Sequence, residues 1–337
     1  MKDTAIHGPI IKNKTHLPVL GTVSVKAGRM TSTDLNIWIE TGTELPDGLY
    51  RQVGGDWVPS PIEPDDFPHF EPVQGPGFEF ELDPIAFKRA LACASTDKTR
   101  HILNSVLFRI EEGGITVAAT DGRRLTVFAL ETKRKPAKSI HGDCVIGHDD
   151  GVHHKVALNP LALLLRDKKR TTITATIEHK EGSRRIALDN GEQRITAKLV
   201  EGTYPNFHAV IPKELSGLFY VDRTTMADTL KKAIPFTGKK GHALVLTIGP
   251  DALGILSEDE GEDLRLEQSI PIRHERRCEC KPIALDPHYL LDSFIQEDGP
   301  IYVGYEDECS PVCFGTHITQ GQIDRNNITV QMPMRIS

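Results

Sequence analysis

Four segments of the chain repeat one pattern: an apolar residue, then Asp or Asn, usually Pro, and further apolar residues at helical spacing. They begin at Leu82, Leu158, Val221 and Leu285. Asp and Asn side chains accept hydrogen bonds from the free N–H groups at the start of a helix, and Pro fits the first helical position. Each segment therefore predicts the start of a short helix.

Strand-like sequence follows each predicted helix, rich in β-branched residues and turn signals. These runs span residues 115–130, 171–198, 243–272 and 301–334. A helix followed by several antiparallel strands, repeated along the chain, predicts an α+β fold with helices on one face and sheets on the other. Two repeats make a domain of ordinary size. The expected boundaries are a central domain at 76–213 and a C-terminal domain at 214–337, with a shortened domain at 1–75.

The segment from Ala119 to Leu125 supports two interpretations. Asp121-Gly122 lies between two apolar runs, which predicts the turn of a β-hairpin. The same residues, read as Thr-Asp-Gly-x-Arg-Leu, resemble the central-domain motif of bacterial sliding clamps, the β subunit of DNA polymerase III. Two more segments resemble that family in the expected order. They are Glu201-Gly202-Thr203-Tyr204-Pro205-Asn206-Phe207, running on to Pro212, and Met332-Pro333-Met334-Arg335-Ile336.

The resemblance implies a fold of repeated DNA-clamp domains, with helices lining a channel and antiparallel sheets outside. It also implies a processivity factor that encircles duplex DNA without reading sequence and has no catalytic site of its own. The implied partners are the DNA polymerase III catalytic subunit, the clamp loader and other proteins with clamp-binding peptides, often of the type Gln-Leu-x-Leu-Phe. A homodimer is the favoured assembly and a trimer is the alternative.

In this family a pocket receives the partner peptide. Leu, Val and Met side chains suit an adaptable apolar floor, and Arg and Tyr can pack an apolar body while presenting a polar tip. Ala209 departs from the long basic residue common in the family, so one wall should be lower. Core packing is the alternative for the aliphatic members. The matching positions are Leu103, Thr120, Gly122, Arg124, Leu125, Pro205, Val210, Tyr289, Val330, Met332, Pro333, Met334 and Arg335.

Basic residues on the predicted helices could face the DNA channel, and Lys14, Arg100 and His101 match positions near the channel in the family. Contacts there with phosphates would position the duplex without reading its sequence. A solvated helix face or loop is the alternative for each of them. The predicted contacts are Lys14, Lys88, Arg89, Arg100, His101, Arg223, Lys231 and Lys232. The fourth helix carries Asp292 instead of basic residues, so the inner wall should be uneven.

Residues 1–75 depart from the family pattern. Leu17 to Gly21 and Ser32 to Leu35 resemble the first strands of a clamp, but no segment before Asp83 shows the helix-start pattern. Residues 42–76 are dense in Gly, Pro and acidic residues, which break regular structure. The sequence therefore predicts an N-terminal domain without helices. This puts ring closure in question and leaves a second function open, a non-encircling adaptor or decoy that binds clamp-interaction peptides.

The formal net charge is −7. A net negative charge disfavours a sequence-specific DNA-binding protein, because such a protein gains much of its affinity by neutralising phosphates with basic side chains. A ring that is linked topologically to DNA needs only a locally basic inner wall. No apolar run approaches the length of a membrane span, and no secretory signal is evident, which predicts a cytoplasmic protein.

The cysteine and histidine clusters admit a zinc interpretation. Cys309, Cys313 and His317 form one group, and His274, Cys278 and Cys280 form another. Neither spacing matches the usual paired C-x2-C arrangement. His148 to His154 is more simply a solvated turn. The acidic run 258–263 could attract a divalent cation weakly, but it lacks the regular ligand alternation of a calcium loop. Six scattered cysteines indicate reduced thiols. The sequence therefore predicts no metal and no cofactor.

Overall fold

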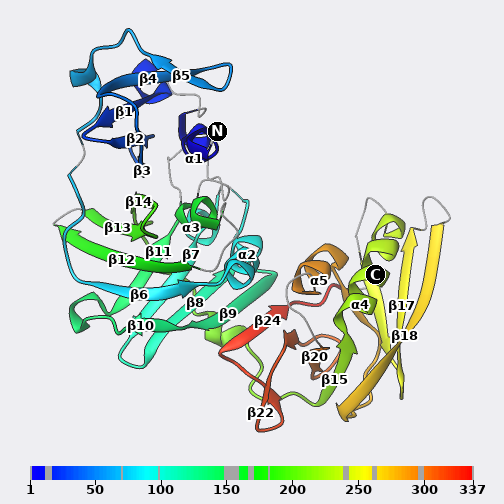
Figure 1. The fold of residues 1–337 in the computed structure, drawn as a ribbon. Coiled ribbons are helices and arrows are strands. Elements are labelled where there is room, and N and C mark those ends of the chain that lie inside the picture. The colour runs from blue at the N-terminus through cyan, green and yellow to red at the C-terminus, as the bar shows by residue number, and fades with distance from the viewer. Residues whose placement is uncertain are drawn as a thin grey trace. The chain divides into compact units, whose positions relative to one another are not determined.

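The computed structural model describes residues 2–11, 17–69, 71–97, 99–147, 159–165, 171–180, 183–237, 243–259, 264–294 and 300–335. The chain forms two compact units (Figure 1). The first contains residues 1–117 and 130–204, and the second contains residues 118–129 and 205–337. The predicted division into three domains stays a prediction.

A ten-stranded antiparallel sheet forms much of the first unit. Its strand order is β10-β6-β12-β13-β14-β3-β2-β1-β4-β5. The strands are β1 (Thr22–Lys26), β2 (Arg29–Thr33), β3 (Ile37–Gly42), β4 (Gly48–Val53), β5 (Asp56–Pro59), β6 (Gly77–Leu82), β10 (Thr132–Arg134), β12 (Thr171–Lys180), β13 (Ser183–Asp189) and β14 (Gln193–Lys198). Ile39 of β3 pairs with Ile195 of β14. Residues before 75 therefore extend the sheet of the segment that follows them.

The first unit also contains β11 (Gly142–Ile146), β7 (Val106–Glu111) and the start of β8 (Gly114–Thr120), paired in that order. Helices α2 (Pro84–Cys93) and α3 (Pro160–Leu164) accompany these strands, with short 3-10 turns η3 (His101–Asn104) and η4 (Lys138–Ile140). Phe80 of β6, Phe87 of α2 and Phe108 of β7 are fully buried, with ring centroids 5.8–5.9 Å apart. This aromatic cluster joins a helix to two sheets.

The N-terminus corrects the sequence prediction that residues before Asp83 contain no helix. Helix α1 (Lys2–Ile11) packs on β1, β2 and β3, and its Ile10 is buried. The predicted strand at 17–21 is the 3-10 turn η1 (Pro18–Gly21), and a further 3-10 turn, η2, spans Pro64–Asp66. The N-terminal segment therefore retains one helix over its sheet.

The second unit is built on a sheet ordered β9-β24-β21-β20-β15-β18-β17-β16-β19. Its elements are β9 (Arg124–Leu130), η7 (Phe207–Val210), β15 (Gly217–Asp222), α4 (Arg223–Ala233), η8 (Ile234–Phe236), β16 (Leu244–Ile248), β17 (Ala252–Asp259), β18 (Leu264–Arg276), β19 (Ile283–Leu285), α5 (Pro287–Phe294), β20 (Pro300–Tyr305), β21 (Val312–Gly315), β22 (Ile318–Thr319), β23 (Gln322–Ile323) and β24 (Asn327–Gln331). Helices α4 and α5 pack together. Their Leu230 and Phe294 are buried in one core with Phe219.

All four predicted helix starts are confirmed. Asp83 accepts the backbone N–H groups of Ile85 and Ala86, and Asn159 accepts that of Leu161. The other two caps, at Asp222 and Asp286, accept N–H groups in the first turns of α4 and α5. The predicted hairpin is also confirmed, as β8 and β9. In the described part of the chain, no helix is long and apolar enough to cross a membrane.

Candidate partner-peptide site

The turn between β8 and β9 is held by the side chains of the Thr-Asp-Gly-x-Arg-Leu motif. The Thr120 hydroxyl donates to the Arg124 carbonyl at 2.6 Å and accepts the Gly122 N–H at 3.0 Å. Asp121 accepts the N–H groups of Arg123 and Arg124 at 2.8 and 3.0 Å. Gly122 has a φ of +87°, a conformation that glycine adopts without steric cost. The motif therefore specifies the turn and fixes the direction of Arg124.

The Arg124 side chain contacts three others, those of Asp121, Asp292 and Tyr289. Its Nε donates to Asp121 at 3.2 Å and its Nη1 to Asp292 of α5 at 2.6 Å, while only 11% of the side chain is exposed. The guanidinium carbon lies 4.0 Å from the ring centroid of Tyr289, a cation–π contact. Burial, with a smaller effect of the Asp121 carboxylate, raises the pKa of Tyr289. Arg124, Tyr289 and Asp292 therefore form one rigid cluster.

The C-terminal segment docks beside this cluster. Strand β24 pairs with β9, and Gln331 lies opposite Arg124. Beyond the strand, the Met332 N–H donates to the Arg123 carbonyl, and the Met334 N–H donates to the Ala284 carbonyl, each at 2.8 Å. Two backbone bonds thus hold the Met-Pro-Met segment in place. The Met332 side chain remains 38% exposed.

A groove of about 940 Å³ lies next to Val210 and Met332. It is lined by His208, Ala209, Val210, Ile211, Pro212, Lys213, Glu306, Pro311, Arg325, Asn326 and Met332. Val210 is 43% exposed, so the groove has apolar surface accessible to a ligand. Arg325 donates to the Ile211 carbonyl at 3.1 Å and holds the 208–213 segment against the turn before β24.

The structure brings together part of the predicted pocket. Thr120, Arg124, Tyr289 and the Met332–Met334 segment meet through the contacts given above. Leu125 and Val330 are 2% and 1% exposed and pack in the core, as the alternative reading expected. Pro205 and Arg335 are exposed, and Leu103 belongs to the first unit. Whether these residues bind a peptide stays a prediction.

The sequence did not predict two groups of residues that lie next to the predicted pocket. Asp292 was noted only as an acidic residue on the fourth helix, because nothing in the sequence joins it to Arg124, 168 positions away. Lys213, Glu306, Pro311 and Arg325 line the groove from three separate segments. Of these four residues, only Lys213 lies next to a recognised motif, directly after Pro212. That position was the one sequence signal that could have placed a residue of this group at the groove.

The predicted DNA contacts differ in exposure. Lys88 and Lys232 are exposed, and exposed Lys231 is paired with Asp228 at 3.1 Å. Arg89 is a correction, since it is only 8% exposed and does not present its charge on the surface. Of three more predicted contacts, His101 is exposed and Arg223 is half-buried, while the Arg100 side chain is paired with Asp97. Lys14 lies outside the described residues.

The cysteine groups do not converge on a ligand set. Among the described residues, no three His, Cys, Asp or Glu side chains are placed to hold a metal ion. Burial raises the pKa of Cys313 to about 12 and is the main cause that raises the pKa of Cys280 to about 11. Residues 148–154 and 260–263 lie outside the described residues.

Comparison with known proteins agrees with this architecture. Residues 85–206 match the family description "DNA polymerase III beta subunit, central domain". A curated beta sliding clamp of Chlamydia muridarum is 24% identical over 277 residues, covering 81% of this chain and 69% of the relative. That of Synechocystis sp. is 26% identical over 242 residues, covering 68% of this chain but only 59% of the relative.

Solved sliding clamps share the fold. The clamp of Pseudomonas aeruginosa bound to griselimycin has a TM-score of 0.77 at 20% identity, covering 99% of this chain and 96% of that one. The clamp of Bacillus subtilis has a TM-score of 0.78 at 16% identity, covering 100% and 97%. The fold is thus that of a DNA clamp. Residues 85–206 and the curated relatives thus make the chain similar to the bacterial sliding clamps, the β subunits of DNA polymerase III.

Proposed function

We propose that this protein is a DNA sliding clamp. In this proposal, it encircles duplex DNA as a homo-oligomer in the cytoplasm, and it acts as a processivity subunit without a catalytic site of its own. Proteins that carry a clamp-binding peptide, the replicative polymerase and the clamp loader among them, dock at the pocket beside the β8–β9 turn. The match of residues 85–206 to the central domain of the DNA polymerase III beta subunit and the curated sliding-clamp relatives support this function.

One observation supports the pocket most directly. The Met332–Met334 segment is fixed by backbone hydrogen bonds to Arg123 and Ala284, yet the Met332 side chain remains 38% exposed. A segment held by its backbone that leaves an apolar side chain accessible beside the exposed Val210 suits an apolar peptide anchor.

The proposal is tested with a fluorescent Gln-Leu-x-Leu-Phe peptide and calorimetry. Deleting residues 332–337 should weaken binding at least tenfold, because one buried apolar anchor contributes roughly 1.5–3 kcal/mol. Met332→Ala should also weaken peptide binding. This variant keeps the backbone hydrogen bond from residue 332 to the Arg123 carbonyl.

The matched control is Leu264→Ala, which removes another apolar side chain, 41% exposed, from β18. It should leave peptide affinity unchanged. Equal affinity of the wild type and the deletion variant would refute the pocket assignment. Peptide binding without retention on circular DNA would instead favour the adaptor or decoy function.

A further inference from the structure

The groove beside Val210 and Met332 combines an apolar surface with charged residues. Its apolar lining residues are Ala209, Val210, Ile211, Pro212, Pro311 and Met332. The Lys, Arg, Asp and Glu residues in its lining are Lys213, Glu306 and Arg325. The apolar surface suits the anchors of a clamp-binding peptide, as proposed above. Nothing in that proposal uses the charges.

The two basic residues of the groove lie close together. Arg325 donates from Nη2 to the Ile211 carbonyl at 3.1 Å, and Lys213 follows Ile211 by two positions. Both basic residues are exposed, so a ligand can reach their charges. Among the described residues, neither takes part in an ion pair. The groove therefore presents two accessible positive charges side by side.

The acidic residues near the groove are mostly engaged elsewhere. Asp307 accepts two backbone N–H groups of its own loop, at 2.8 and 2.6 Å, and Glu308 pairs with Lys281 at 2.9 Å. Asp324 likewise accepts a backbone N–H group, at 2.9 Å. Glu306 is the one acidic residue in the groove lining, so two positive charges there stand against one negative charge.

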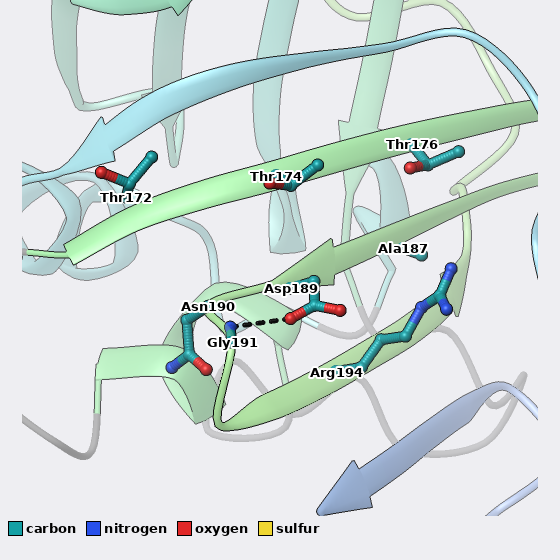
Figure 2. A pocket seen from close by; sticks show the side chains of 8 residues that line it. All are labelled: Thr172, Thr174, Thr176, Ala187, Asp189, Asn190, Gly191 and Arg194. Atoms are coloured by element: carbon teal, nitrogen blue, oxygen red, sulfur yellow. Dashed lines mark hydrogen bonds between the residues drawn. The ribbon is translucent and has the colours of Figure 1, made fainter.

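A second cavity, of about 510 Å³ on β12, β13 and β14, lacks both features (Figure 2). Three threonines line it, and Ala187 is the one apolar residue of its lining. Its two charged residues are Asp189 and Arg194, and the Arg194 Nε is buried. This cavity therefore offers neither an apolar surface nor an excess of charge, and the groove is the stronger candidate for a selective site.

We propose that Lys213 and Arg325 bind an acidic side chain that flanks the apolar anchors of the partner's clamp-binding peptide. This inference rests on the proposed peptide site, and it describes the partner segment more closely. A carboxylate beside Lys213 gains a charge-assisted hydrogen bond and is attracted by both cations. Glu306 belongs to the segment after β20, and its charge disfavours a carboxylate at that part of the groove. The acidic residue is therefore directed to Lys213 and Arg325.

The apolar lining is the reason to assign these cations to a peptide rather than to the backbone of DNA. Phosphates offer no apolar group to Val210, Pro311 or Met332, whereas a peptide buries this surface and places a carboxylate at its edge. The same charges discriminate between partners. A basic residue in the flank would lie next to like charges, and that repulsion disfavours the wrong segment.

The test compares three capped peptides that share the core Gln-Leu-Ser-Leu-Phe. They differ in the two residues added at each end of the core, which are Asp, Asn or Lys. Calorimetry with the full-length protein should show two- to fivefold tighter binding of the Asp peptide than of the Asn peptide. The Lys peptide should bind most weakly. The advantage of the Asp peptide should shrink as NaCl is raised from about 0.05 M to about 0.5 M, because salt screens exposed ion pairs.

Three variants assign the effect to residues. Lys213→Gln should remove most of the advantage of the Asp peptide and leave the affinity for the Asn peptide unchanged. Glu306→Gln should enlarge that advantage, because it removes the negative charge of the groove. The matched control is Lys26→Gln on β1, which removes an exposed lysine from the first unit and should leave all three affinities unchanged. Circular dichroism verifies that each variant is folded.

The outcomes separate this inference from the proposed peptide site. Equal affinity for the Asp and Asn peptides would overturn the inference and leave the peptide site standing. If none of the three peptides binds, the peptide site fails and the inference fails with it. Lys213→Gln would also overturn the inference if it weakened the Asp and Asn peptides by the same factor. Stronger competition by a short DNA duplex against the Asp peptide than against the Asn peptide would assign the cations to DNA instead.

Discussion

Arg124 shows how one side chain can organise a surface formed by distant segments. It joins the β8–β9 turn to α5 through Asp121 and Asp292, and it lies over the Tyr289 ring. A partly buried charge is costly unless it is paired, and here two carboxylates pair with it. The cluster therefore gives the predicted pocket a rigid wall.

Asp292→Asn tests that wall. The variant removes one of two carboxylates from Arg124, so the guanidinium should leave the Tyr289 ring more often. We expect three- to tenfold weaker binding of the Gln-Leu-x-Leu-Phe peptide, with a stability loss within about 1 kcal/mol because Asp292 is partly exposed.

Calorimetry and denaturant unfolding measure these two quantities. Asp228→Asn is the matched control, since it removes an exposed Asp paired with Lys231 on α4. Peptide affinity that is equal for Asp292→Asn and the wild type would show that the ion pair does not shape the pocket.

His7 is a second residue with a specific physical role. It is fully buried, and its ring nitrogens lie 2.7 Å from the Ser32 hydroxyl and 2.9 Å from the Thr41 hydroxyl. These contacts attach α1 to β2 and β3. Burial lowers the pKa of His7 from 6.5 to about 4. The folded protein therefore holds this side chain neutral.

Stability should fall as pH drops from 6.5 towards 4, because the unfolded chain then binds a proton that the folded chain excludes. No stability is lost to this protonation well above pH 6.5, and the loss amounts to roughly 2 kcal/mol at pH 5. His7→Gln should remove that part of the pH dependence in urea unfolding between pH 7 and 5. His208→Gln, at an exposed histidine, should retain it; identical pH profiles for wild type and His7→Gln would contradict the account.

At the residue scale, local motifs were predictable and long-range contacts were not. Thr120 to Leu125 could be recognised because their turn chemistry is local. The pairing of Arg124 with Asp292 depends on how α5 packs, which no sequence spacing encodes. Arg89 was expected on a channel surface, but the helix turns it into a buried position. One charged residue on a helix does not by itself indicate its face.

At the scale of elements, side-chain capping explains where the helices begin. Asp83 accepts two backbone N–H groups of the first turn of α2, at 2.8 and 3.4 Å. These donors have no partner within the helix, so the cap replaces water for them. The same chemistry at Asn159, Asp222 and Asp286 made four helices predictable from the sequence.

Asp83→Ala should lower the free energy of unfolding by about 1 kcal/mol, because the first turn of α2 loses its acceptor. Asp83→Ser is the matched control, since Ser also caps helices well and should recover most of the loss. Urea unfolding followed by circular dichroism measures both. Equal stability of the Ala and Ser variants would indicate that the cap contributes little.

Helix α1 shows the limit of element prediction. Its sequence contains Gly8 and Pro9, which are typical of helix ends and turns, and it has no recognisable cap. Contacts of His7, Ile10 and Ile11 with the sheet below stabilise it instead. Tertiary packing overrides local helix propensity here. Capping residues and helix-breaking Gly and Pro in the sequence therefore do not predict helix α1.

At the scale of the whole molecule, the charge balance fits a topological mode of DNA binding. A formal net charge of −7 gives little overall attraction to phosphates. An encircling protein is retained by linkage to the duplex, so it needs few strong contacts. The sheet also continues from β14 into β3, which gives residues before 75 a structural role. The sequence alone indicated strand-like segments there but not this continuity.

The most direct test of the account is retention on DNA of defined topology. Wild-type protein is loaded by a bacterial clamp loader onto nicked circular DNA, and the complex is then passed through a sizing column at high salt. If the protein encircles DNA, it should stay with the circle and be released when a restriction enzyme linearises the DNA. Equal loss from circular and linear DNA at the same salt concentration would contradict encirclement.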